Sequence, residues 1–341
     1  MMRIPAERLH EFGTRIFVGA GVPPEVAARV MQNLVRADRY GIHSHGVVRL
    51  ADYVRAVQKG RIHADAQPSV VTQSAVTALL DGHWGFGQVV AEHAMQLAIE
   101  KAKANGIAIV CMRNSTHVGA IGEYTEMAAN AGLVGLAFVN GVGLLVAPHG
   151  GKSRRLSTNP LAFSVPVPGG RPILVDFATS IVAEGKLKVA RNKGASIPPG
   201  WVLNSQGEAS TDPNDLYAGG VLLPVGEHKG YGLSIMVEIL GGLLGGAGAA
   251  MLGNAPSNGC CFIAIAPDCF RPADEFLADV RRLVETLRAT PPGQGMTAVL
   301  VPGDPEAQTE AEYARDGIPL DDVTWQTIMD AARSVGVEYE P

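Results

Sequence analysis

The sequence predicts an α/β protein of about two domains, and three observations carry this prediction. Short β-branched segments alternate with longer helical patterns along most of the 341 residues. Hydrophobic residues make up 47% of the chain and charged residues 18%, which is typical of a globular protein with a large core. The texture changes from helical to strand-rich near residues 65–75, which indicates a domain boundary.

The elements follow from periodicity and from helix-start signals. Prolines at two helix starts fit their fixed φ and missing N–H donor, and we expect the N-terminal helices over 5–18, 23–39 and 48–59. β-Branched runs then predict strands over 70–72 and 76–80, with a turn at Asp81-Gly82. Alternating helical and apolar patterns predict a helix over 89–105, a strand over 107–112, a helix over 121–130 and a strand over 134–140.

The segment 150–224 is rich in Gly, Pro, Asn and Ser, with short strands expected at 162–167 and 172–177. Ordered loops of this length usually line a site. Beyond them we expect a helix over 229–252, a strand over 260–266, a helix over 274–288, a strand over 297–301, and helices over 305–315 and 320–334.

Composition excludes several classes of function. The net charge of −5 and the lack of a basic stripe disfavour nucleic-acid binding. Residues 233–252 are apolar and long enough to span a membrane, but Glu238 lies inside them, so we expect a buried helix and no membrane partner. The charged N-terminus lacks the apolar core of an export signal, and the four cysteines show no metal-ligand spacing, so a cytoplasmic protein with reduced thiols is expected.

Residues 36–50 contain the densest group of chemically active side chains. His45 and Arg49 stand four residues apart, so a helical turn after Gly46 would place an acid-base group and an anion clamp on one face. A loop histidine bonded only to backbone is the alternative for His45. A metal site through His43 and His45 would need a third ligand, which no spacing identifies, so we expect no metal.

No dinucleotide fingerprint follows a strand in this chain, so an ordinary Rossmann unit is not expected. The segment 114–122 runs from a strand end to a helix start and offers backbone donors to a phosphate, although a capped structural turn fits equally well. His117 within it is either a structural histidine or a contact to cofactor or substrate. Lys229 is either a solvated cap or an anion contact.

Several motifs occur together in order, and the chain thereby resembles the malate/L-lactate dehydrogenase family over about residues 5–335. This family stands apart from the Rossmann enzymes and includes ureidoglycolate and sulfolactate dehydrogenases, diketogulonate reductase and cyclic-imine carboxylate reductases. The first motif is the GIxSHGxxRL core at 41–50. The others lie at 115–119, 126–129, 147–151, 158–160, 176–180, 229–233 and 301–303.

The resemblance implies a fold and a partner. The sheet is expected to be mixed, in an NAD(P)-binding domain over 71–304, and a helical domain is expected from residues 1–70 joined by 305–341. Members transfer hydride between a nicotinamide and a 2-oxo or 2-hydroxy acid of the malate, lactate or sulfolactate type. They are typically homodimers with the active site near the subunit interface.

The resemblance also implies residue roles. His45 would be the acid-base group, Ser44 would orient it, Arg49 would hold the substrate carboxylate, and Thr158 would assist at the substrate. His117 is the alternative acid-base residue. The cofactor positions implied are His117, Val118, Gly119, Ala120, Ile121, Asp176, Phe177, Ala178, Lys229, Pro302, Gly303 and Glu306.

Two departures from the relatives refine the expected activity. The cyclic-imine reductases carry an aspartate ten residues after the one at position 176, whereas this chain has Lys186, which favours hydroxy acids. No cation flanks Pro302 in the sequence and Glu306 could bind a ribose hydroxyl, so we expect NAD rather than NADP. The alternatives are an NADPH-dependent cyclic-imine carboxylate reductase and a catalytically silent ligand-binding dimer.

Overall fold

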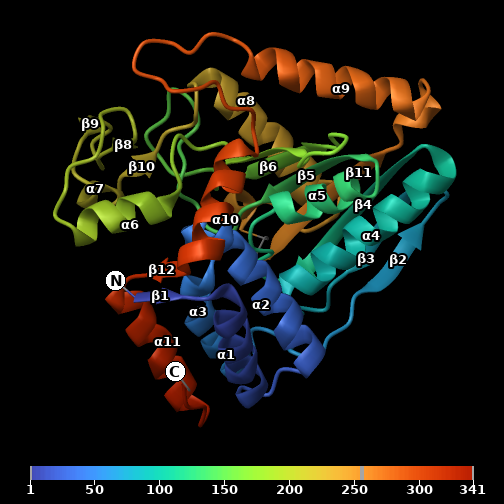
Figure 1. The fold of residues 1–341 in the computed structure, drawn as a ribbon. Helices are drawn as coiled ribbons and strands as arrows, with labels where there is room; N and C mark the ends of the chain where they lie inside the picture. The colour runs from blue at the N-terminus through green and yellow to red at the C-terminus, as the bar shows by residue number, and fades with distance from the viewer. Residues whose placement is uncertain (1, 254–256, 340–341) are drawn as a thin grey trace.

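The computed structural model describes residues 2–253 and 257–339, and a mixed seven-stranded sheet forms the centre of these residues (Figure 1). The strand order is β2-β3-β4-β11-β5-β6-β7, in which β3 and β4 are parallel and the other neighbours antiparallel. The strands are β2 (Ser69–Gln73), β3 (Thr77–Asp81), β4 (Ile107–Ser115), β5 (Val134–Asn140), β6 (Pro160–Val165), β7 (Ile173–Ala178) and β11 (Asn258–Ile265). The predicted α/β class and mixed sheet are confirmed.

Helices cover both faces of this sheet. On one face, α4 (Gly87–Asn105) and α5 (Gly122–Asn130) pack over an apolar cluster that includes Val110 and Phe262. On the other, α8 (His228–Val237) and the π-helical turn Glu238–Leu243 pack over Phe138. Helix α9 (Ala273–Arg288) follows β11 and lies at the edge of the molecule (Figure 1).

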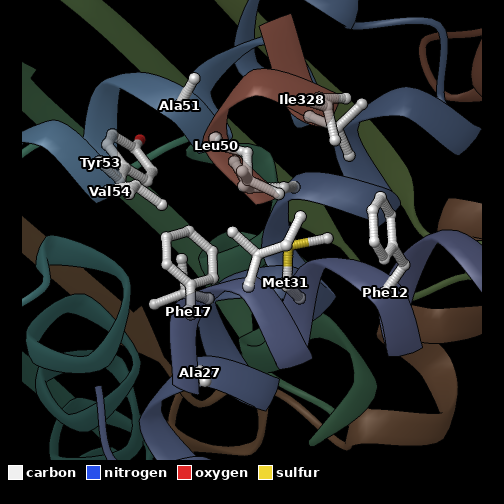
Figure 2. Packing of buried hydrophobic residues seen from close by; sticks show 14 of the residues in the cluster. Phe12, Phe17, Ala27, Met31, Leu50, Ala51, Tyr53, Val54 and Ile328 are labelled. Atoms are coloured by element: carbon white, nitrogen blue, oxygen red, sulfur yellow. The ribbon is translucent and has the colours of Figure 1, made fainter. Parts of the chain in front are cut away.

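The two ends of the chain form one helical layer. Strand β1 (Met2–Ile4) pairs with β12 (Ile318–Leu320), and one apolar cluster unites residues from 4–86 and 318–332. The helices are α1 (Ala6–Gly19), α2 (Pro24–Arg39), α3 (Leu50–Gln58), α10 (Asp304–Asp316) and α11 (Asp322–Ser334). Figure 2 shows Phe17, Met31 and Leu50 directed toward one another in this cluster. The division at residues 70 and 305 remains a proposal, which this cluster supports.

Two local predictions need correction. The helix expected over 229–252 is regular only to Val237, continues as a π turn to Leu243, and then stops at glycines such as Gly246 with φ of +74°. The strand expected over 297–301 does not form, because Met296 and Leu300 are exposed and only Pro302 bonds to the sheet.

The middle segment contains more regular structure than its loop-like composition predicted. It forms α6 (Glu184–Asn192), α7 (Asn214–Tyr217) and a small sheet of order β10-β8-β9. The three short strands are β8 (Val202–Leu203), β9 (Ala209–Ser210) and β10 (Val221–Leu222). Within the described residues, no helix is long and apolar enough to cross a membrane.

Candidate functional site

A buried carboxylate on α2 organises the turn that carries Ser44 and His45. Asp38 Oδ1 accepts a hydrogen bond from His43 Nδ1 at 2.8 Å, and its Oδ2 accepts from the Val47 amide at 2.7 Å. The carboxyl group lies against Gly46, where a Cβ atom would stand 2.2 Å from Asp38 Cγ. The two bonds bracket residues 44 and 45, so the turn is held at both ends. The sequence analysis did not single out Asp38.

Burial is the main cause of the raised pKa of Asp38, and the bonds from His43 and Val47 oppose it. The bond to Asp38 raises the pKa of His43. Both shifts therefore favour a proton in the bond between the Asp38 carboxyl group and the His43 ring. The role of His43 is accordingly structural.

Three residues predicted from the sequence meet at this turn. Ser44 Oγ lies 2.9 Å from His45 Nδ1, and Arg49 Nε donates to the Ser44 carbonyl oxygen at 2.8 Å. Within the described residues, no protein acceptor binds the Nη atoms of Arg49. Those two nitrogens are therefore available to a bidentate anion such as a carboxylate.

His117 joins the cluster from the loop between β4 and α5. Its ring stacks on that of His45, with centroids 5.5 Å apart and 20° between the planes. Tyr53 Oη lies 2.6 Å from His117 Nδ1, and Gln88 Nε2 donates to Tyr53 Oη at 3.1 Å. Sequence reasoning missed Tyr53 and Gln88. The four-residue spacing of positions 45, 49 and 53 could have indicated Tyr53, whereas nothing local indicates Gln88.

Both histidines are neutral near pH 7. Burial and then the Arg49 cation lower the pKa of His45 to about 4. Burial, then His45 and Arg49, lower the pKa of His117 well below its usual value. Burial raises the pKa of Tyr53 to about 12, so its hydroxyl keeps its hydrogen. The site therefore holds one fixed positive charge, on Arg49, beside two neutral imidazoles.

Ion pairs between α2 and α5 fix the helical layer against the sheet. Arg36 pairs with Glu126, and Asn33 Nδ2 donates to Glu123 Oε2 at 2.5 Å. Asn33 also presses on the loop after His117, because a Cβ atom at Gly119 would lie 2.0 Å from Asn33 Oδ1. These contacts hold His117 in register with the turn that carries His45.

The cofactor residues implied by the resemblance partly converge. Gly122, directly after the segment 117–121, donates its amide hydrogen to Asp176 Oδ2 at 2.8 Å. Burial raises the pKa of Asp176 to about 6, the Gly122 bond and Arg36 oppose this, and Glu306 adds to it. The first amide of α5 therefore already binds a carboxylate. A pyrophosphate at that helix start stays a prediction and would have to use the preceding loop.

The loop at 301–306 lies beside β7, since the Leu174 amide donates to Pro302 O at 3.1 Å and Gly303 packs against Pro172. Glu306 Oε2 is buried and has no hydrogen-bond partner. An acceptor in that state fits a donor from outside the chain, such as a ribose hydroxyl. The residues near Asp176 therefore fit a nicotinamide dinucleotide, and the observation that supports this is the buried, unpaired oxygen of Glu306.

One premise of the NAD prediction needs correction. Arg288 Nη2 lies 2.6 Å from Asp304 Oδ1, so a cation does stand beside this loop, brought there from α9. Asp304 already neutralises it. The cofactor preference therefore depends on Glu306 and no longer on the absence of a cation.

The remaining predicted residues, as far as the structure describes them, are not bonded to the histidine pair. Thr158 O accepts hydrogen bonds from the Thr179 amide and hydroxyl, and Ala178 and Phe177 end β7 beside it. Lys229 is exposed in the first turn of α8. Within the described residues, no hydrogen bond or ion pair joins Thr158 or Lys229 to His45, Arg49 or His117.

Helix α6 begins against the serine of the site. A Cβ atom at Gly185 would lie 3.2 Å from Ser44 Cβ, and the following residue, Lys186, is exposed in the first turn of the same helix. No group of three or more His, Cys, Asp or Glu side chains in the described ranges could hold a metal ion.

A family model described as malate/L-lactate dehydrogenase matches residues 4–329 of this chain. A malate dehydrogenase of Pyrococcus abyssi is 40% identical, covering 99% of this chain and 96% of its own length. An L-sulfolactate dehydrogenase of Methanothermobacter thermautotrophicus is 37% identical, covering 99% of both chains.

Solved structures agree with this relationship. A malate dehydrogenase from Pyrococcus horikoshii superposes with a TM-score of 0.90 at 36% identity and covers 99% of this chain and 97% of its own. A delta1-piperideine-2-carboxylate reductase from Pseudomonas syringae pvar. tomato superposes with a TM-score of 0.86 at 32% identity, over 97% of this chain and 100% of its own.

Proposed function

The chain belongs to the malate/L-lactate dehydrogenase family and is an oxidoreductase acting on CH–OH donors, and on that premise we propose that it interconverts a 2-oxo acid and a 2-hydroxy acid. The observation that carries the proposal is the cluster of His45, His117 and Arg49, in which two neutral imidazoles face a guanidinium with free Nη atoms. Such a set matches a carboxylate beside a reacting carbonyl or hydroxyl group.

Arg49 orients the substrate in this proposal. Its Nε is anchored on the Ser44 carbonyl oxygen, so the two Nη atoms point in a fixed direction. A planar fork of this kind binds a carboxylate through two parallel hydrogen bonds. Binding the carboxylate also screens the Arg49 charge, which raises the pKa of His45 and eases its protonation.

His45 moves the proton. During reduction the protonated ring gives its Nε2 proton to the carbonyl oxygen and is left neutral with its hydrogen on Nδ1. During oxidation that neutral ring takes the hydroxyl proton on Nε2. Ser44 Oγ, at 2.9 Å from Nδ1, orients the ring and hydrogen-bonds either tautomer. In our proposal, Thr158 assists at the substrate, from a position next to Thr179.

A bound nicotinamide cofactor supplies the hydride for reduction and accepts it in the reverse direction. The residues proposed to hold it are those at 117–121, Asp176 to Ala178, Lys229, and Pro302 to Glu306. Glu306 Oε2, buried and unpaired, would accept from a ribose hydroxyl, which favours NAD over NADP.

Cyclic-imine reduction is the competing activity, because one structural relative is named as such a reductase. The residue that disfavours it is Lys186, which follows Gly185 in the first turn of α6 beside Ser44. A lysine at this position has no acceptor, so it cannot accept a hydrogen bond from the serine–histidine pair as an aspartate would.

A substrate panel tests the proposed function. We expect oxidation of NADH, in preference to NADPH, with oxaloacetate, pyruvate and 3-sulfopyruvate as 2-oxo acids, and little turnover with cyclic imino acids. Absorbance at the reduced-nicotinamide band measures each pair. A rate confined to cyclic imines with NADPH would replace the proposal by imine reduction, and failure of NADH to bind would indicate a silent ligand-binding protein.

The pH dependence of hydroxy acid oxidation should carry the signature of His45. Burial and Arg49 lower its pKa to about 4, so at pH 5 about nine tenths of the free enzyme still has the neutral base. We expect kcat/KM for oxidation to hold as pH falls through 6.5 and to decline only near pH 4. The kcat/KM profile reports the free enzyme. An acid limb centred at 6.5 would contradict the assignment.

The same shift links pH to stability. The folded pKa of His45 lies below its unfolded value, so the unfolded chain binds the proton first as pH falls from 6.5 toward 4. The free energy of unfolding therefore decreases across that range.

We further propose a homodimer with the site near the subunit interface, in the cytoplasm. The exposed apolar side chains along α8 and the π turn, such as Ile235, Ile239 and Leu243, support association. The four unpaired cysteines support a reducing compartment. Sedimentation velocity at micromolar concentration should give twice the 35.7 kDa chain mass. A single 35.7 kDa species would reject the dimer.

A further inference from the structure

The two stacked histidines differ in what faces their Nδ1 atoms. His117 Nδ1 receives two donors, the Tyr53 hydroxyl at 2.6 Å and the Gly119 amide at 3.3 Å. A backbone N–H can only donate, so this nitrogen acts as an acceptor and carries no hydrogen of its own. The hydrogen of the neutral His117 ring is then on Nε2.

Gln88 sets the direction of the Tyr53 hydroxyl. Its Nε2 donates to the Tyr53 oxygen at 3.1 Å, which leaves the hydroxyl hydrogen for His117. Both residues are buried, with Gln88 0% and Tyr53 7% exposed, so protein groups are the main partners of the Tyr53 hydroxyl. The reversed amide would make Tyr53 donate to Gln88 and would require a hydrogen on His117 Nδ1, against the Gly119 amide.

The orientation leaves one acceptor of Gln88 unpaired. Gln88 Oε1 is buried without a hydrogen-bond partner, whereas the reversed amide would leave two amide hydrogens unpaired at the same place. The amide nitrogen of Gln88 therefore binds Tyr53, while the amide oxygen of Gln88 has no partner. A buried polar atom without a hydrogen-bond partner is expected where the side chain has a functional role in the site.

His45 faces a different partner. Ser44 Oγ both donates and accepts, so a hydrogen on His45 Nδ1 is as acceptable as a bare Nδ1. His45 can therefore gain a second hydrogen without losing a bond. His117 would have to expel both the Tyr53 and the Gly119 donors to do so.

We propose that Gln88 and Tyr53 are positioning residues that lock His117 as a neutral ring with its hydrogen on Nε2, so that His117 donates a hydrogen bond to the reacting oxygen while His45 alone transfers the proton. The role in the reaction rests on the proposed function. The lock itself is a property of the free protein. Burial also lowers the pKa of His117, which agrees with a ring that stays neutral.

Nitrogen-15 NMR of the imidazoles in the full chain without ligand tests the lock. His117 is assigned as the signal lost in His117→Gln. We expect a bare Nδ1 and a hydrogen-bearing Nε2 from pH 5 to pH 8. A hydrogen on Nδ1 in the wild type, or titration of the ring within that range, would overturn the proposal.

Variants of the relay supply the decisive comparison. In Gln88→Glu the carboxylate accepts from Tyr53, whose oxygen then accepts from His117, so the hydrogen should move to Nδ1. Tyr53→Phe removes the nearer of the two donors with little change of shape. Only the long 3.3 Å bond from the Gly119 amide then favours a bare Nδ1, so a mixture of tautomers should result. Gln96→Glu, exposed on the same helix, should leave the wild-type spectrum. An unchanged His117 spectrum in both folded relay variants would refute the lock.

Kinetics separates the role in catalysis from the lock. Loss of one preorganised donor to a developing oxyanion lowers kcat by about 10²–10³-fold. We expect a drop of that order in Gln88→Glu for whichever 2-oxo acid is turned over, with a much smaller change in its KM. An unchanged kcat beside a reversed tautomer would remove the donor role of His117. No turnover of any 2-oxo acid by the wild type would reject the proposed function while the NMR result still decided the lock.

Discussion

Replacing His45 by asparagine should lower kcat for 2-oxo acid reduction by about 10²–10⁴-fold, which is the usual contribution of a positioned acid-base group. Asparagine can keep a hydrogen bond to Ser44 but cannot take up or release a proton. Because His45 is not among the proposed cofactor residues, NADH affinity should be retained, as measured by quenching of its fluorescence.

His93→Asn is the matched control, because His93 is exposed on α4 away from the cluster, and we expect wild-type kcat from it. Wild-type kcat in folded His45→Asn would show that His45 does not move the proton. A loss of NADH binding in that variant would instead indicate that His45 helps to hold the cofactor.

Arg49→Lys should raise KM for the 2-oxo acid by about 10–100-fold, with a smaller effect on kcat. Lysine cannot anchor on the Ser44 carbonyl through a secondary nitrogen while presenting two parallel donors to a carboxylate. One charge-assisted hydrogen bond contributes about 1.5–3 kcal/mol, and 1.4 kcal/mol corresponds to a tenfold change.

Arg55→Lys on the same helix provides the control, since Arg55 is exposed and pairs only with the neighbouring Asp52 in the described residues. Its KM should equal that of the wild type. A fall of kcat in Arg49→Lys at constant KM would contradict the proposal that Arg49 binds the substrate carboxylate. It would indicate that Arg49 stabilises only the transition state.

Periodicity predicted the elements well where one face of each element is buried by its neighbours. The helices over 24–39 and 273–288 and the strand over 134–140 lie within one residue of expectation. It failed at 297–301, where an apolar run has no partner strand in the described residues, and after Val237, where a helical pattern meets a π turn and glycines. A periodic pattern records what a segment can form, and packing decides whether it does.

The site divides in the same way. Ser44, His45 and Arg49 are neighbours in sequence, so their bonded geometry alone brings them within contact distance. Asp38 was missed although it stands in the same segment, because its role appears only when Gly46 leaves space for the carboxyl group. Local order thus predicted which residues would lie together and not what holds them in place.

Long-range contacts decided the remainder. Tyr53 and Gln88 stand 35 residues apart and meet at His117 only because α3, α4 and the loop after β4 pack together. Arg288 comes to Asp304 from another helix, which corrected the argument about cofactor choice.

By itself, the sequence determined the α/β class and the family, and it predicted the Ser44–His45–Arg49 group, because those depend on short-range pattern and residue chemistry. Only the tertiary structure decided how His117 and Glu306 are placed, and it supports the proposed hydrogen on Nε2 of His117. The physical reason is that a donor's direction and an acceptor's burial depend on groups far apart along the chain, and hydrogen bonds act over about 3 Å.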